Sequence, residues 1–190
     1  MHRRQFLTRA AGLGVAAAFP MVPALAHTPY AQWDVFRKRN LQVLTSHADL
    51  QGDEVGDEWV AILRDKLPLS RAMVSRAHDM PRVAALLKTN QSKLAVLSYM
   101  HARLMFTGSA PFEEYAPMPL EILVDDGKFL LVTWPDLPLH HGFLITATLM
   151  SEASKLHLQN SGKGKFGMQL HAGARAFLNG EKLDMPPAES

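Results

Sequence analysis

The chain contains no cysteine among its 190 residues. Disulfide bonds and a cysteine nucleophile are therefore excluded, and the hydrophobic core must supply the stability of the fold alone. Other motifs of catalysis are also missing, because no H-E-x-x-H pair, no G-x-S-x-G turn and no phosphate-binding glycine-rich loop occurs. These absences favour a non-catalytic protein without a cofactor. A hydrolase is the weakest of the functions we consider.

Long hydrophobic segments are missing as well. The apolar run Ala10–Phe19 is too short for a bilayer of about 30 Å, and two prolines follow it. This run lies between the twin arginine Arg3-Arg4 and an exit at Ala24-Leu25-Ala26, which is the layout of a secretory signal. The twin arginine favours the twin-arginine export route. We therefore expect residues 1–26 to be a cleaved leader of a periplasmic protein, rather than a membrane anchor.

A strongly basic surface is absent once the leader is removed. The whole chain has a formal charge of +2, but Arg3, Arg4 and Arg9 all lie in the leader, which has no acidic residue. The rest of the chain has seventeen basic and eighteen acidic residues, a formal charge of −1. Because no basic stripe remains, we expect no nucleic-acid partner. Residues 27–190 are sufficient for a single domain with a sizeable core.

Strand-like and helix-like segments alternate in the first half of this domain. Residues 41–47, 70–78 and 93–100 have the apolar or β-branched patterns of strands. Residues 56–67 and 79–91 have the apolar spacing of helices. A β-α-β-α-β order with short loops predicts a parallel sheet with right-handed crossovers.

The second half has a different pattern. Two apolar strands over residues 120–134 enclose Asp125-Asp126-Gly127-Lys128, which is a strong hairpin signal. Residues 143–150 predict a helix, and the glycine-rich residues 160–167 predict a flexible loop. Together the two halves predict one α/β domain, a three-layer sandwich with a mostly parallel sheet.

Four segments also carry a family resemblance: residues 41–63, 75–102, 129–153 and 170–183. In this order they resemble the TAXI family, the solute-binding proteins of one class of TRAP transporter. The resemblance implies a fold like one lobe of a type-II periplasmic binding protein, with the hairpin standing where a second lobe would be. In the last segment Ala172 replaces the proline of the family, and His171 is expected near the cap of a closing helix. A role in solute binding for transport follows from the resemblance.

The candidate binding site is at the carboxyl ends of the predicted strands, where ligands bind in sheets of this kind. Three segments meet there, residues 45–56, 76–79 and 98–103. Their hydroxyl groups, guanidinium group and helix N-terminal amides suit a carboxylate or another small organic anion. The candidate ligand-binding residues are Thr45, Ser46, His47, Arg76, His78, Ser98, Tyr99 and His101.

Two other interpretations remain open. These polar groups are also typical of ordinary loops that cap helices, and the chain would then be an accessory module. Such a module would dock on a membrane transporter or on another periplasmic partner protein. Alternatively, His47, His78 and His101 would together bind copper or zinc, although no ligand spacing in the sequence indicates a metal site.

Overall fold

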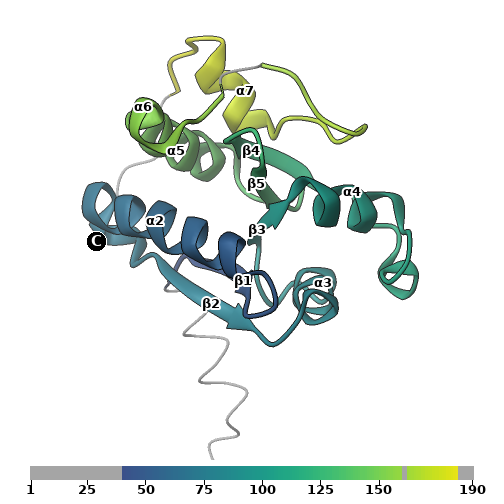
Figure 1. Ribbon diagram of the computed structural model, residues 1–190. Helices are drawn as coiled ribbons and strands as arrows, with labels where there is room; N and C mark the ends of the chain where they lie inside the picture. Colours follow the sequence, from purple (N-terminus) through teal and green to yellow (C-terminus); the bar gives the residue numbers. More distant parts are fainter. Residues whose placement is uncertain (1–39, 160–161, 184–190) are drawn as a thin grey trace, which may run out of the picture.

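The computed structural model describes residues 40–159 and 162–183. The predicted leader, residues 1–26, therefore lies outside the described residues. Within them, a five-stranded sheet separates two layers of helices (Figure 1). None of the helices in this part of the chain has the length and apolar character needed to cross a bilayer.

From β1 to α4 the elements follow one another with short connections. The strands are β1 (Gln42–Ser46), β2 (Met73–Ala77), β3 (Leu94–Ser98), β4 (Glu121–Asp125) and β5 (Phe129–Thr133). The α-helices are α2 (Leu50–Lys66), α3 (Met80–Lys88), α4 (Tyr99–Thr107), α5 (Leu139–Met150), α6 (Ala153–Leu156) and α7 (Ala172–Leu178). Two short 3-10 turns are η1 (Pro68–Ser70) and η2 (Glu113–Tyr115).

The sheet has the strand order β2-β1-β3-β5-β4. Strand β1 pairs in parallel with β2 and β3, whereas β5 runs antiparallel to both of its neighbours, β3 and β4. In this sheet β5 therefore runs antiparallel to the other four strands. This topology confirms the predicted α/β class with a mostly parallel sheet, and it confirms the predicted hairpin between β4 and β5.

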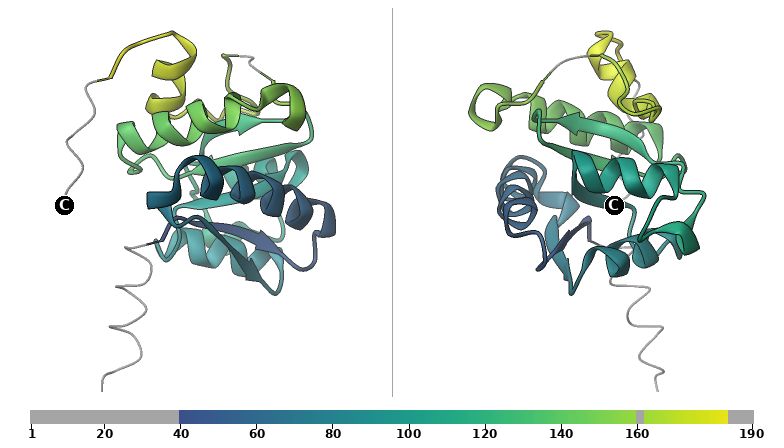
Figure 2. Two further views of the ribbon diagram at one scale, coloured as in Figure 1. Left: turned by 90° about the vertical axis from the view of Figure 1, so that its left-hand side faces the viewer. Right: turned by 45° about the vertical axis from the view of Figure 1, so that its right-hand side comes forward.

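Both faces of the sheet are buried. Neighbouring residues of a strand point to opposite faces, so Val43 packs in the core with Trp59 of α2. Leu44 belongs to the core on the other face, together with Val83 of α3. Helices α2 and α5 lie side by side on the first face, and α3 and α4 cover the second (Figure 2). All residues of β5 are buried, as expected for a strand with both faces covered.

Three helix starts differ from the prediction, those of α2, α4 and α5, and α5 begins at Leu139 rather than at residue 143. Helix α2 begins at Leu50 rather than Gly56, because Asp49 caps it by accepting a hydrogen bond from the Gly52 N–H at 3.0 Å. Helix α4 begins directly after β3, in the segment 98–103 that was expected to be a loop. Glycine resembles a loop signal in the sequence, yet Gly56 serves close packing. A Cβ there would lie 2.4 Å from Cγ2 of Thr45.

His171 connects three elements near the end of the described chain. Its side chain is 1% exposed, and its backbone N–H donates to the carbonyl oxygen of Ile122 in β4. Its Nδ1 accepts a hydrogen bond from the Gly173 N–H at 3.1 Å and thereby caps α7. The ring proton therefore resides on Nε2, which donates to the Leu137 carbonyl oxygen at 2.9 Å. These contacts confirm that His171 lies at the cap of the closing helix.

We predict that His171→Ala lowers the free energy of unfolding by about 2–4 kcal/mol, since it leaves a cavity and two unsatisfied buried backbone groups. Urea unfolding of the purified protein measures the change. The control is His78→Ala, because the ring of His78 is 94% exposed and its loss should cost less than about 0.5 kcal/mol. Equal stability of the two variants would contradict the role assigned to His171.

Candidate functional site

The carboxyl ends of β1, β2 and β3 lie on one side of the sheet, together with the starts of α2, α3 and α4 (Figure 1). We call this side the carboxyl edge. The turn between β4 and β5 reaches it too, because the Tyr99 N–H donates to the Lys128 carbonyl oxygen at 2.9 Å. The structure therefore places all three predicted segments on the same edge. Their side chains form three separate networks there.

The first network joins β1, β2 and α2. The hydroxyl of Thr45 donates to Asp53 at 2.6 Å, and Nε of Arg76 donates to the same carboxylate at 2.9 Å. Nη2 of Arg76 also donates to Asp57, at 2.6 and 2.7 Å from its two oxygens. These hydrogen bonds, first to Asp53 and then to Asp57, raise the pKa of Arg76. Two carboxylates of the chain itself thus occupy the guanidinium group that was predicted to bind an anion.

Asp53 is the central group of this network. Burial raises the pKa of the Asp53 carboxyl, but the hydrogen bonds from Thr45 and Arg76 outweigh it and lower the pKa below its ordinary value of 3.8. Neither Asp53 nor Asp57 was predicted as a site residue: Asp53 was placed in the loop before the helix, and Asp57 in the first turn of the predicted helix. With α2 beginning at Leu50, the two acids lie four residues apart on one face of the helix.

The second network contains a serine, a histidine and an aspartate. Oγ of Ser98 is 2.9 Å from Nδ1 of His101, and Oδ2 of Asp49 is 3.6 Å from the same nitrogen. In a catalytic triad the serine and the acid contact opposite nitrogens of the ring. Ser98 and Asp49 also cap α4 and α2 by accepting backbone N–H groups. This arrangement therefore fixes two helix starts and does not have the geometry that activates a serine.

The third network joins Tyr99 to two residues that sequence analysis missed. The Tyr99 hydroxyl donates to Oδ1 of Asp125, whose side chain is almost fully buried. Nζ of Lys165 donates to the Tyr99 hydroxyl at 2.6 Å and lies 3.0 Å from Oδ2 of Asp125. Burial and the hydrogen bond to Asp125 raise the pKa of Tyr99, and the contacts with Tyr99 and Asp125 raise that of Lys165. Lys165 is therefore a cation, and Tyr99 a neutral donor, at neutral pH.

The remaining candidate residues are not joined in one site. Ser46 is buried, and its hydroxyl accepts the Ala48 N–H at 3.2 Å. His47 and His78 are exposed, and His78 is 3.4 Å from Asp79. In the stretches 40–159 and 162–183, no group of three or more His, Asp or Glu side chains could hold a metal ion. His47, His78 and His101, which were proposed to bind copper or zinc, do not form such a group.

The carboxyl edge also exposes three large apolar side chains. Leu50, Met100 and Phe166 are 72%, 61% and 41% exposed, respectively. They lie on the same edge of the sheet, because the Asp49–His101 contact joins the N-cap of α2 to the first turn of α4. The rings of Tyr99 and Phe166 meet edge to face at 5.5 Å. We call Leu50, Met100 and Phe166 the apolar ridge. Large exposed apolar side chains that gather on one edge are typical of binding surfaces.

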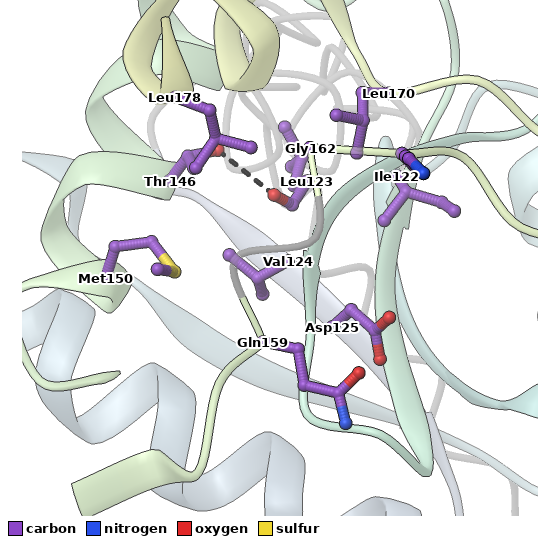
Figure 3. A pocket seen from close by; sticks show the side chains of 11 residues that line it. Ile122, Leu123, Val124, Asp125, Thr146, Met150, Gln159, Gly162, Leu170 and Leu178 are labelled. Atoms are coloured by element: carbon purple, nitrogen blue, oxygen red, sulfur yellow. Dashed lines mark hydrogen bonds between the residues drawn. The ribbon is translucent and has the colours of Figure 1, made fainter. Parts of the chain in front are cut away.

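A small pocket lies elsewhere, between β4, α5 and Gly162 (Figure 3). Its apolar lining includes Val124, Met150 and Leu178. Thr146 borders it and donates its hydroxyl to the Leu123 carbonyl oxygen at 3.4 Å. The enclosed space accommodates about one water molecule, which is too little for the predicted organic anion.

Comparison with protein-family models, with curated proteins and with solved structures finds no match for this chain.

We predict that Asp53→Asn destabilises the protein at pH 7 and that the difference from the wild type shrinks below about pH 4. The reason is that the pKa of Asp53 is lowered in the fold, so its ionised form stabilises the fold above its ordinary pKa of 3.8. This stabilisation is lost as the pH falls through the folded-state pKa. Urea unfolding between pH 3 and pH 7 measures it, with the exposed Asp65→Asn on the same helix as the control. A difference that does not change with pH would contradict the assignment.

Proposed function

We propose that this chain is an exported, non-catalytic binding protein of the solute-binding type, with a fold like one lobe of a type-II periplasmic binding protein. The resemblance of four segments to TAXI proteins supports the proposal. The structural observation that supports it most is the convergence of three strand ends and three helix starts on one edge of a mostly parallel sheet. Sheets of this class bind ligands at such an edge.

The start of α4 is the part of the edge where we place an anionic ligand. Lys165 keeps its charge there: its Nζ donates a hydrogen bond to Tyr99 and lies 3.0 Å from the carboxylate of Asp125. The positive end of the α4 dipole points to the same place. Arg76 is less suitable, because it pairs with two carboxylates, Asp53 and Asp57, whereas Lys165 pairs with one, Asp125.

The apolar ridge determines which kind of anion would fit at this part of the edge. Met100 and Phe166 border the start of α4, so a ligand whose carboxylate meets Lys165 would lay its remaining atoms on apolar side chains. We therefore propose a small organic acid with an apolar part. A ligand of this kind buries apolar surface and satisfies one charged group.

A second candidate is an accessory module that docks on a periplasmic enzyme or on a membrane transporter. The observation that favours it is the exposure of Leu50 beside carboxylates that already occupy Arg76. Because carboxylates of the same chain pair with Arg76, this part of the edge is suited to contact with a protein surface. The test of the first candidate also decides between the two.

We expect organic acids with an apolar part to raise the melting temperature of the purified protein. A ligand at a hundred times its Kd adds about 2.7 kcal/mol, which corresponds to roughly 5–10 °C for a chain of this size. The corresponding amides serve as neutral controls and should have no effect.

Lys165→Met should abolish the shift, whereas Lys93→Met should retain it, because Lys93 pairs with Asp136 and precedes β3 at the opposite end of the strand. Lys165→Arg should restore part of the shift if the positive charge is what the acid binds. A full shift in Lys165→Met would contradict the placement of the ligand. If no acid changes the melting temperature, the accessory role is favoured.

A further inference from the structure

The carboxyl edge carries charges of opposite sign on its two halves. Its acidic half lies on the side of β2 and the first turns of α2 and α3, where five carboxylates outnumber the two guanidinium groups of Arg76 and Arg82. Its basic half lies on the side of α4 and the β4–β5 turn. The acidic half contains Asp49, Asp53, Glu54, Asp57 and Asp79, and the basic half contains Arg103, Lys128 and Lys165.

Contacts within the chain leave this separation of charge intact. On the basic half, Asp125 pairs with Lys165, and Asp126 accepts hydrogen bonds from the backbone N–H groups of Lys128 and Phe129. The side chains of Arg103 and Lys128 are exposed, and neither forms an ion pair with another described residue. The basic half thus keeps two cations without an acidic side-chain partner.

The acidic half keeps exposed acids in the same way. Asp57 remains 57% exposed although it pairs with Arg76, and Glu54 is exposed one turn into α2. Asp49 and Asp79 cap helices, but a cap does not remove the negative charge. Leu50, in the first turn of α2, and Met100, in the first turn of α4, lie where the halves meet, since Asp49 and His101 join the two helix starts.

We propose that two copies of this chain associate through the carboxyl edge about a twofold axis that passes near the apolar ridge. In a twofold interface the same patch faces itself, so the acidic half of one copy meets the basic half of the other. The apolar ridges of the two copies then cover each other. An edge with opposite charges on either side of an apolar centre is complementary to itself, and this property favours a second copy over an unrelated protein.

The inference deepens the proposed function and rests on it in one respect: an organic acid held at the start of α4 would lie between the two copies. The second copy would then exclude water from a ligand that a single edge leaves exposed. The association itself depends only on the charges and the apolar ridge. Its failure and the failure of ligand binding are therefore separate results.

Sedimentation velocity of the purified protein at increasing concentration tests the association directly. We expect a monomer–dimer equilibrium that weakens as salt is added, because exposed charges are screened. Met100→Asp should weaken the dimer at least about tenfold, as expected for a central apolar contact. Leu69→Asp is the matched control, since Leu69 is 88% exposed but lies in η1, before β2, at the other end of the strands.

Charge reversal provides a second, independent test. Arg103→Glu and Glu54→Lys should each weaken the homodimer, because each places like charges opposite one another. An equimolar mixture of these two variants should dimerise again, since every reversed charge then meets its reversed counterpart. Both residues are exposed, so neither substitution is expected to disturb folding.

A monomer at every concentration would overturn the inference, as would a dimer that Leu69→Asp disrupts and Met100→Asp does not. Failure of the mixture to dimerise would also overturn it, because the halves would then not face each other. A monomer whose melting temperature still rises with organic acids would refute the dimer and leave the proposed function standing. A dimer whose melting temperature does not change with organic acids would refute the proposed ligand and leave the dimer standing.

Discussion

The fold depends on the need to bury both faces of one small sheet. Strands β1, β3 and β5 are apolar on both sides, so helices must cover each face, and a parallel order of β1, β2 and β3 supplies those helices as crossovers. Each crossover helix starts where a strand ends. The starts of α2, α3 and α4 therefore meet on one edge of the sheet as a direct consequence of the packing of the core.

Polar groups at this edge are largely satisfied by the chain itself. Asp49 and Asp79 cap helices, Asp53 joins Thr45 to Arg76, and Asp125 joins Tyr99 to Lys165. These contacts position the loops and leave little freedom to their side chains. What remains available at the surface is the apolar ridge with charged groups on either side of it. The edge is therefore better suited to a ligand with an apolar part, or to a protein surface, than to a bare inorganic anion.

Period and turn chemistry were sufficient to predict the order of the strands, the helices α2, α3 and α5, and the hairpin at Asp125–Lys128, but not the helix α4. They were not sufficient for the starts of the helices. Gly52 and Gly56 resemble loop residues, although both are buried in α2, and no turn residue separates β3 from α4. Local sequence cannot distinguish a glycine that bends the chain from one that allows a helix to approach a strand.

The positions of the candidate residues were predictable from strand ends, but their partners were not. Arg76 and Asp53 are 23 residues apart, and Tyr99 and Lys165 are 66 residues apart. Such pairs depend on tertiary structure, and they change the chemistry of the residues involved. Arg76 was predicted as an anion ligand and pairs with two carboxylates, whereas Lys165 was assigned to a flexible loop and pairs with Asp125 beside Tyr99.

The central claim is that the carboxyl edge is the surface through which this protein binds. Hydroxyl-radical footprinting at rising protein concentration, with and without organic acids, tests it most directly by comparing the oxidation of exposed side chains. The account predicts that Leu50, Met100 and Phe166 become protected while Leu69 reacts at a constant rate. Equal reactivity of all four side chains under every condition, or protection of Leu69 alone, would contradict it.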